Sequence, residues 1–440
     1  MSWLAASNPC PGLFYGTAAQ DGTLIRIRVP GGCISRDQAI AIVEIADRWQ
    51  TSRVQVTNRA NLQFRALRSI PSPEVFSTLQ SVGLASQNPH LDHLRNIMAS
   101  PTAGIDPAEL IDVRSLVQAI DTDLQNTPEL IGLPPKFSIG IDGGGAIGIG
   151  ARSKSAWQHR YNEIQLSAVT DDRFKLTLGS NRRFYETGVL IKKSDCVAAI
   201  SALTQPYLAY VQQSQSQKKP RLRDLLKDWG IESYLERVPF QFEHDSDASI
   251  SPARTRSAAE LTQYLGIQPQ RQPGRAYIGI ALKLGWMTIA QLRGLIQLAE
   301  TYGSGELRLT PWQSILLPDV AIDQTATVLD AIAALELSTD LINSTVVACA
   351  GKPGCAASET HTQAHALTLI DQLNHPVNIH VTGCPKRCAQ PSPAEFTLLG
   401  TTVQGSEAYA LFAGDRPLSD RPILASELST IVELINTLHD

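Results

Sequence analysis

Alternating and helical hydrophobic patterns divide this chain into short strands and amphipathic helices. Residues 22–65 predict a strand at Leu24–Val29, a helix after Ser35, and two strands around a turn at Asn58–Asn61. The buried face of that helix is predicted to comprise Ala39, Ile42, Val43 and Ala46. Strands, helices and hairpins alternate in this way along the whole chain, which predicts the α+β class.

A second segment, residues 277–317, has the same layout. It predicts a strand at Tyr277–Leu282, a helix after Thr288, and a strand pair flanking Pro311 and Trp312. Two segments with one plan, far apart in the sequence, indicate an internal repeat.

The two segments also agree in detail. Ser35 and Thr288 each precede a helix and are followed three residues later by a glutamine, which is the pattern of a capping box. The turn regions align at a constant offset of 253 residues without a gap, as Thr57 and Thr310 illustrate. We therefore expect a duplication whose halves pair their strands into one pseudo-symmetric domain.

The predicted domain plan has three parts. Residues 10–85 and 271–335 would form the duplicated domain, residues 90–240 a mixed α+β domain, and residues 340–440 a second mixed domain that contains most of the cysteines. The glycine run at 143–145 follows a strand and precedes apolar residues, so it predicts a hairpin turn between strands. It lacks the strand–turn–helix setting of a dinucleotide site, and we expect no flavin or nicotinamide site.

Composition narrows the class of protein. A chain of 440 residues with 43% hydrophobic and 18% charged residues is typical of a globular protein of about three domains. The net charge of −4 argues against a general nucleic-acid binder. No signal peptide or membrane span is evident, so we expect a cytoplasmic protein without a membrane partner.

Four cysteines near the C-terminus are the strongest chemical signal. Five residues separate Cys349 from Cys355, three separate Cys384 from Cys388, and 28 lie between the pairs. Paired thiolates on short Gly- and Pro-containing loops favour a cubane iron–sulfur cluster. Zinc remains an alternative, although it prefers a closer first pair; a disulfide framework or unliganded thiols are the other possibilities. The remaining cysteines are interpreted as small apolar residues: Cys10, Cys33 and Cys196.

The turn at residues 57–65 is unusually basic. If Leu62 and Phe64 face the core, then Gln63 and Arg65 share the opposite face of the strand, and Arg59 in the turn could reach the same ligand. Guanidinium groups of this kind suit an anionic, carboxylate-rich ligand. The alternative is a solvated hairpin edge protected by charge. The repeat has proline and tryptophan at the corresponding turn positions, so a single functional site is expected.

His361 and His365 lie four residues apart on a predicted helix directly after Cys355. They would share one helical face and could bind iron together with a carboxylate. The alternative interpretation, two solvent-facing helical histidines, is favoured because the neighbouring apolar residues supply the buried face.

Together these residues resemble the sulfite/nitrite reductase superfamily and, within it, the precorrin-3B synthases of cobalamin biosynthesis. The resemblance covers nearly the whole chain. It is carried by the two cysteine pairs and by segments Cys10–Leu13, Thr57–Gln63, Arg95–Asp106, Leu133–Phe137 and Gly305–Trp312. It implies an α+β fold with duplicated ferredoxin-like half-domains in pseudo-two-fold arrangement, plus two mixed α/β domains.

The resemblance also implies metal ligands. A 4Fe–4S cluster would be held by Cys349, Cys355, Cys384 and Cys388. In the reductases the last cysteine also bridges to sirohaem iron, a role that would fall on Cys388. The second iron centre is expected to be either sirohaem or a mononuclear non-haem iron. Electrons would come from NADH or ferredoxin through a separate donor protein or reductase.

The catalytic residues implied by the resemblance are Arg59, Arg95 and Lys136. Sulfite reductases have a second lysine two residues after the first, where this chain has Ser138, which puts a six-electron reductase role in doubt. The substrate-binding set is expected to be Arg59, Asn61, Arg65, Arg95 and Lys136.

The function expected from this resemblance is that of an oxygen-dependent oxidoreductase, a monooxygenase acting on a tetrapyrrole substrate. It would convert precorrin-3A to precorrin-3B by hydroxylation and lactone formation. The alternative is a sirohaem-dependent ferredoxin sulfite or nitrite reductase, in which the tetrapyrrole is a cofactor. A third reading is an iron–sulfur binding or sensing protein without turnover. We expect a monomer in each case.

Overall fold

The computed structural model describes residues 11–149, 162–179, 184–216, 218–244, 264–390 and 394–439. Its helices are α1 (Arg36–Arg48), α2 (Pro73–Ser81), α3 (Arg114–Gln125), α4 (Cys196–Gln213), α5 (Leu222–Trp229), α6 (Ile231–Glu236), α7 (Ile289–Tyr302), α8 (Thr325–Ala334), α9 (Ile342–Thr345), α10 (Gly351–Gly354), α11 (Thr362–Gln372) and α12 (Leu428–His439). None of these described helices is both long and apolar enough to cross a bilayer. The described strands form four sheets interspersed with helices, which confirms the α+β class.

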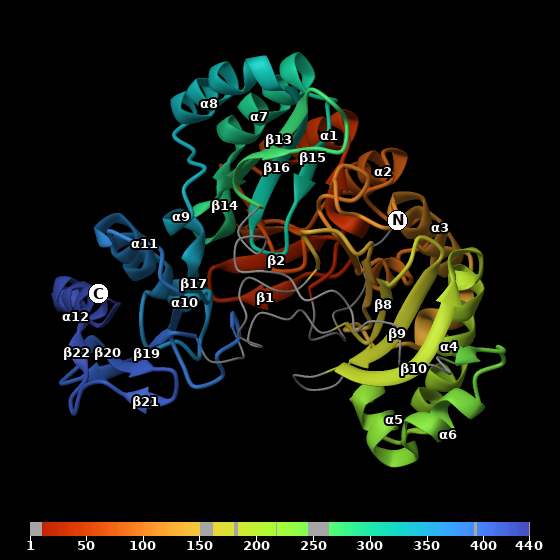
Figure 1. Ribbon diagram of the computed structural model, residues 1–440. Helices are drawn as coiled ribbons and strands as arrows, with labels where there is room; N and C mark the ends of the chain where they lie inside the picture. Colours follow the sequence, from red (N-terminus) through yellow and green to blue (C-terminus); the bar gives the residue numbers. More distant parts are fainter. Residues whose placement is uncertain are drawn as a thin grey trace.

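The two repeated segments each supply most of one five-stranded sheet. The first sheet has the order β1 (Thr17–Ala19), β2 (Gly22–Ile27), β5 (Leu62–Leu67), β4 (Arg53–Val56) and β14 (Trp286–Thr288). The second has the order β12 (Gly266–Pro269), β13 (Arg275–Ala281), β16 (Ser314–Ala321), β15 (Leu307–Leu309) and β3 (Cys33–Ile34). Each half therefore lends a short strand to the edge of the other half's sheet, since β14 pairs with β4 and β3 with β15. Figure 1 shows the two halves side by side, in red-orange and in teal.

The halves match in backbone conformation as well as in topology. Both capping boxes are present, with Ser35 accepting from the Gln38 N–H and Thr288 from the Gln291 N–H. A register shift occurs at the same place in each, and left-handed residues recur at the offset of 253. The left-handed pairs are Gly31 and Leu284, Gly32 and Gly285, Ala60 and Gln313, and Ala66 and Asp319.

One hydrophobic core joins the two halves. Ile42 on α1 and Phe64 on β5 are fully buried in the same cluster as Leu295 on α7 and Ile315 on β16. Helices α1 and α7 pack against each other across the junction. The duplicated domain is thus stabilised as a single unit.

The middle domain carries a six-stranded mixed sheet. Its order is β11 (Glu243–His244), β10 (Phe184–Lys192), β9 (Arg173–Gly179), β8 (Ile164–Ala168), β7 (Ile139–Asp142) and β6 (Ile97–Ala99). The last three strands are parallel, and the other pairings are antiparallel. Helices α3 and α4 pack together, and residues of both lie in the sheet's core cluster.

The prediction of a hairpin at residues 143–145 is wrong. Strand β7 lies between two parallel neighbours, and the residues from 143 to 149 form no strand. The Gly143 carbonyl instead accepts the N–H groups of Leu110 and Ile111, and a Cβ at Gly143 would lie 2.4 Å from the Ile111 carbonyl oxygen. The glycine therefore permits a close approach of two loops.

The C-terminal domain has a sheet in the order β17 (Val346–Ala348), β18 (Ile379–Thr382), β19 (Phe396–Val403), β20 (Ser406–Ala413) and β21 (Arg416–Pro417), with β22 (Ile423–Leu424) also pairing to β20. Strands β17, β18 and β19 are parallel. Helices α11 and α12 pack against each other, and residues of both lie in the core cluster of this sheet. The cysteine loops begin just after β17 and β18, so they leave the sheet at one edge.

Candidate functional site

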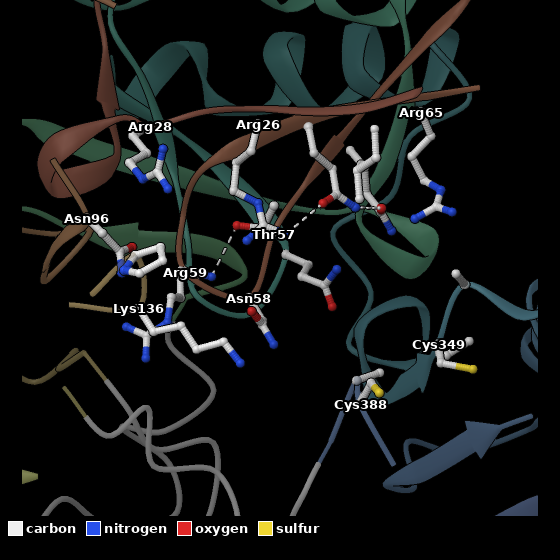
Figure 2. Close-up of a pocket in the computed structure, with 18 of the residues that line it drawn as sticks. Arg26, Arg28, Thr57, Asn58, Arg59, Arg65, Asn96, Lys136, Cys349 and Cys388 are labelled. Carbon is white, nitrogen blue, oxygen red and sulfur yellow. Dashed lines mark hydrogen bonds between the residues drawn. The ribbon is translucent and has the colours of Figure 1, made fainter. Parts of the chain in front are cut away.

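A cavity of about 470 Å³ lies where the first half-domain, the middle domain and the C-terminal domain meet. Six cationic side chains line it: Arg26, Arg28, Arg59, Arg65, Lys136 and Arg221. Cys349 and Cys388 line the same cavity. Figure 2 shows Arg59 and Lys136 on one side and the two thiols on the other. The structure thus brings the basic turn and the cysteine motifs to one place.

Strand alternation delivers the cations of the first half-domain. Leu62 and Phe64 are fully buried in the core, while Gln63 and Arg65 line the cavity, as the alternation on β5 predicted. Arg26 on the neighbouring β2 donates from Nη2 to Gln63 Oε1 at 3.0 Å. The two strands together present a polar face to the cavity.

Arg59 spans the boundary between two domains. Its Nη1 donates to Asn162 Oδ1 at 2.9 Å and lies 3.4 Å from Met98 Sδ in the middle domain. The following residue, Ala60, has a φ of 53°, and the Thr57 hydroxyl accepts the Arg59 N–H. The tight turn therefore directs this guanidinium across the cavity.

Lys136 is the most available cation. It is exposed at the cavity wall, next to Pro135, and its amine makes no hydrogen bond or ion pair with any described residue. Ser138, two residues later, adds no positive charge to the cavity. Ser138 is fully buried, and its hydroxyl accepts the Glu163 N–H at 3.4 Å.

The other cations are anchored by carboxylates. Arg28 Nη1 lies 3.1 Å from Asp92 Oδ2, and both side chains are buried. Arg221 Nε lies 2.6 Å from Glu163 Oε1. These pairs hold the guanidinium groups in fixed positions at the wall.

Arg65 connects the cavity with the first cysteine loop. It pairs with Asp21 at 3.3 Å and also donates from Nη2 to the Gly354 carbonyl at 3.2 Å. A Cβ at Gly354 would lie 2.6 Å from Arg65 Nη2, so the glycine lets the guanidinium approach this closely. The basic strand and the loop between Cys349 and Cys355 are therefore in direct contact.

Two residues of the expected substrate-binding set do not line this cavity. Arg95 forms an ion pair with Asp121 at 3.1 Å, donates to the Gly83 carbonyl at 2.8 Å, and has a side chain only 4% exposed. Asn61 is buried, and its Oδ1 accepts the Val29 N–H at 2.8 Å. Arg95 is directed elsewhere by its partners, and Asn61 stabilises the turn that carries Arg59.

The four predicted cluster ligands converge. The pKa of Cys388 is raised by burial and further by the neighbouring thiols of Cys384, Cys349 and Cys355. The Gly383 N–H donates to Cys349 Sγ at 3.3 Å, as backbone amides do around cluster sulfurs. A Cβ at Gly383 would lie 1.8 Å from the Ser358 hydroxyl, so glycine is required beside the thiols.

This arrangement fits a cubane better than zinc. Within the described ranges, no group of three or more His, Cys, Asp or Glu side chains is placed to hold one metal ion. A four-sulfur zinc site would need the thiolates around a single centre, whereas in a 4Fe–4S cluster each thiolate binds a different iron. The loop glycines and the amide donor agree with the latter.

The cavity also fits a carboxylate-rich tetrapyrrole. Its cations come from several segments and surround a space that borders Cys349 and Cys388. Sirohaem carries carboxylate side chains that such cations would bind. The residues suited to this role are Arg26, Arg28, Arg65 and Arg221, because they line the wall and are held in place by their partners.

The two histidines after Cys355 have other partners. His361 Nδ1 lies 2.8 Å from Glu407 Oε1, and His365 Nδ1 lies 2.8 Å from the Tyr409 hydroxyl. Lys352 Nζ also approaches Glu407, at 3.5 Å. The network ties α11 and the first cysteine loop to strand β20, and it does not form an iron site among the described residues.

Sequence reasoning missed Arg26, Arg28 and Arg221. The first two could have been found, because polar residues alternate with Ile25 and Ile27 along β2, which places them on the face opposite the core. No local signal marks Arg221, which reaches the cavity from the start of α5.

The duplicated halves, the neighbouring thiols and the cation-lined cavity are suited to a redox protein that binds an iron–sulfur cluster beside an anionic ligand. Residues 17–82 and 268–335 both match the nitrite/sulfite reductase ferredoxin-like half domain, and residues 91–245 match the nitrite and sulphite reductase 4Fe-4S domain. One half-domain description fits both segments, in agreement with the duplication. The cysteine pairs lie outside these matched ranges.

Similar proteins span most of the chain. A ferredoxin–nitrite reductase of Synechococcus elongatus is 31% identical over 92% of this chain and 82% of its own length. The chloroplastic ferredoxin–nitrite reductase of Zea mays is 28% identical over 93% of this chain and 76% of its own. The structure of Mycobacterium tuberculosis NirA has the same fold, with a TM-score of 0.74 at 20% identity over 94% of this chain and 80% of its own. The chain belongs to the nitrite/sulfite reductase family.

These relationships correct the expected function. The Synechococcus elongatus and Zea mays relatives are named nitrite reductases, so the prediction of a precorrin-3B synthase, with a tetrapyrrole as substrate of a monooxygenase, is wrong. Membership of the family implies a 4Fe–4S cluster together with sirohaem, so the tetrapyrrole is a cofactor. Ser138, in place of a second lysine, does not argue against a reductase, because its side chain is fully buried and does not line the cavity.

Proposed function

We propose that the protein is a sirohaem- and 4Fe–4S-dependent nitrite reductase that accepts electrons from a ferredoxin. The observation that carries this proposal is the cavity in which Arg59 and Lys136 face Cys349 and Cys388. The ferredoxin–nitrite reductases that match over most of this chain support the choice of substrate and donor.

The side chains suit a small oxyanion. When bound, sirohaem and the cluster would supply the electrons and an iron that binds the substrate. Arg59 is fixed across the domain boundary by Asn162 and can hold one oxygen of nitrite by a charge-assisted hydrogen bond. Lys136 has no competing partner in the described chain and can approach from the middle domain. Cations in fixed positions stabilise the developing negative charge without reorganisation.

Protons must reach the same cavity. Reduction of nitrite to ammonium takes up six electrons and eight protons and releases two waters. Lys136 can donate a proton to a substrate oxygen and, because it is exposed, can be reprotonated from solvent. The cations also favour entry of an anion from water.

A direct assay tests the proposal. The holoprotein, purified without air, is supplied with reduced methyl viologen and either nitrite or sulfite. We expect stoichiometric ammonium from nitrite and much slower sulfide formation from sulfite. Faster turnover of sulfite would assign the protein to the sulfite reductases. A holoprotein that contains both cofactors and reduces neither anion would overturn the enzymatic proposal.

A separate experiment identifies the electron donor. Reduced ferredoxin replaces the dye, and NADH alone serves as the comparison. We expect nitrite turnover with ferredoxin and none with NADH, since the similar reductases are named for ferredoxin as their donor. Turnover with NADH alone would contradict the choice of donor.

A further inference from the structure

Two consecutive residues of the middle domain hold two arginines of the cation-lined cavity. Asn162 and Glu163 lie just before β8 and are only 1% and 3% exposed. Glu163 Oε1 lies 2.6 Å from Arg221 Nε, and Asn162 Oδ1 accepts a hydrogen bond from Arg59 Nη1 at 2.9 Å. Both arginines line the cavity, whereas Asn162 and Glu163 do not. Each of these two residues therefore acts on the cavity through an arginine.

The fold provides a close-fitting space for Asn162. A Cβ at Gly140, in β7, would lie 2.3 Å from Asn162 Nδ2, and a Cβ at Gly179, at the end of β9, would lie 1.8 Å from the Asn162 carbonyl oxygen. Neither glycine is in the left-handed region, so the need for space explains both of them. Asn162 Nδ2 donates to Gln165 Oε1 at 3.4 Å. Because the amide nitrogen is directed to Gln165, the amide oxygen is the atom that faces Arg59.

The anchor of Arg59 differs in charge from the anchors of other cavity cations. Carboxylates pair with three of them, Arg28, Arg65 and Arg221. Asn162 has nearly the shape of an aspartate, but its amide carries no charge. It therefore fixes the guanidinium of Arg59 without adding a negative charge beside it. This anchor leaves the attraction of the guanidinium for an incoming anion undiminished.

A second neutral atom of the middle domain contacts the same nitrogen. Met98, on β6, is 1% exposed, and its Sδ lies 3.4 Å from Arg59 Nη1. A thioether sulfur is a weak acceptor without charge. The contacts with Asn162 and Met98 thus both hold Arg59 across the domain boundary by uncharged atoms.

We propose that Asn162 is a positioning residue that adapts the site to an anion, because it fixes Arg59 and preserves the positive charge that Arg59 offers to the substrate. The inference rests on the proposed function, in which Arg59 holds an oxygen of nitrite. A carboxylate in place of the amide would keep the geometry, but it would form a buried ion pair and cancel that charge. An aliphatic side chain would keep the charge and lose the position. Substitution can therefore separate the two contributions.

Asn162→Asp and Asn162→Ala test the proposal in the holoprotein. Titration of nitrite into the oxidised protein, followed by visible absorption, gives a dissociation constant, and steady-state kinetics give kcat and KM. We expect Asn162→Asp to keep both cofactors and the wild-type melting temperature, but to bind nitrite at least about tenfold more weakly. We expect Asn162→Ala to lower kcat by about tenfold with a smaller loss of affinity, because the guanidinium remains charged but is no longer held in place.

Asn126→Asp is the matched control. It adds the same charge at an exposed position of the middle domain that does not line the cavity, and it should change neither affinity nor turnover. Wild-type affinity in Asn162→Asp would overturn the role of charge, and unchanged kinetics in Asn162→Ala would overturn the role in positioning. Equal losses of melting temperature and activity in both variants would make Asn162 a structural residue only. A wild type that binds sulfite and not nitrite would overturn the proposed substrate instead, and the same variants would then test Asn162 with sulfite.

Discussion

At the scale of single residues, the cations of the cavity differ in whether a carboxylate of the protein already pairs with them. Arg28 and Arg221 are matched by buried carboxylates, whereas Lys136 has no described partner. Matched guanidiniums give the wall a fixed shape, and the unmatched amine provides charge to an incoming anion.

Replacing Lys136 tests this distinction. We expect Lys136→Ala to lower kcat/KM for nitrite by at least about tenfold, because the cavity would lose a cation that is available to the anion. The melting temperature should be nearly unchanged, because the side chain is exposed. Steady-state kinetics and calorimetry measure the two effects. Lys193→Ala, at an exposed position in the middle domain that does not line the cavity, is the control and should alter neither.

Glu109 should make stability depend on pH. It is 5% exposed, its Oε2 accepts the Gly104 N–H at 2.6 Å, and no described residue bonds Oε1. Burial raises its pKa from 4.5 to about 8. The protonated form is therefore favoured by folding, and its stabilising contribution is complete below pH 4.5 and lost as the pH rises through about 8.

We expect Glu109→Gln to remove that dependence, because glutamine is uncharged and can still accept the Gly104 N–H. Urea unfolding of both proteins, at about pH 5 and about pH 8.5, measures it. Between the lower and the higher pH, the free energy of unfolding of the wild type should fall by roughly a few kcal/mol more than that of the variant. Parallel losses would show that Glu109 is ionised without penalty.

The direction of a side chain could be predicted from the sequence where the backbone geometry alone determines it. Gln63 and Arg65 share a face because a strand alternates. Arg95 follows a short helical turn, and the direction of its side chain was decided by Asp121, a partner 26 residues away on α3. No local pattern contains that information.

At the scale of elements, the cluster site arises from two loops that leave adjacent parallel strands. Cys349 follows β17 directly, and Cys384 follows β18 by two residues. Because the carboxyl ends of neighbouring parallel strands share an edge, pairs far apart in sequence can meet.

We expect Cys384→Ser to abolish the visible absorption of the cluster and nitrite reduction together. Cys33→Ser, at a half-buried thiol outside the four converging cysteines, should keep both. Absorption spectra and iron analysis of the two proteins, prepared without air, provide the measurement. An intact cluster in the first variant would contradict the ligand assignment.

Substitution by alanine should destabilise the protein more at a closely packed left-handed glycine than at one with open space around it. Gly285 has a φ of 75°, and a Cβ there would lie 2.6 Å from the Val56 carbonyl oxygen. Gly405 has a φ of 84° with nothing within 4 Å. We expect Gly405→Ala to cost about 1 kcal/mol from backbone strain alone, and Gly285→Ala roughly 2 kcal/mol or more because a clash is added. Chemical denaturation compares them, and equal losses would contradict the role of close packing at Gly285.

The elements themselves were largely predictable. Capping boxes and hydrophobic periods identified α1, α7 and the hairpins, since these signals act within a few residues. The run at Gly143 does not form the predicted hairpin, because Gly143 contacts a loop more than thirty residues earlier in the sequence, which no local pattern shows. The exchange of β3 and β14 between the two sheets could not be predicted from a local pattern either, because each strand pairs with residues far away in the sequence.

At the scale of the whole molecule, function depends on the meeting of three domains. The cavity takes Arg59 from the first half, Lys136 from the middle domain and Cys388 from the C-terminal domain. The family and its cofactors could be read from motifs, but the particular chemistry could not, because related members place similar residues around different reactions.

The exchanged edge strands should make the halves fold together. We expect residues 11–90 expressed alone to remain unfolded, because β4 would lose β14, β3 would lose β15, and the shared core would be exposed. Circular dichroism and amide-proton dispersion report this. A folded, monomeric fragment would contradict the interdependence.

That reciprocal exchange bears on how such a chain could arise. An ancestral polypeptide with one half only would have had unpaired edge strands and an exposed hydrophobic core. A second copy of the same polypeptide could have covered both in a two-fold symmetric dimer. After the fusion of two such halves, only one copy of the turn would still need cations. Pro311 and Trp312 occupy the places of Asn58 and Arg59, and Trp312 is buried, so the turn of the second half contributes packing where the turn of the first half contributes charge.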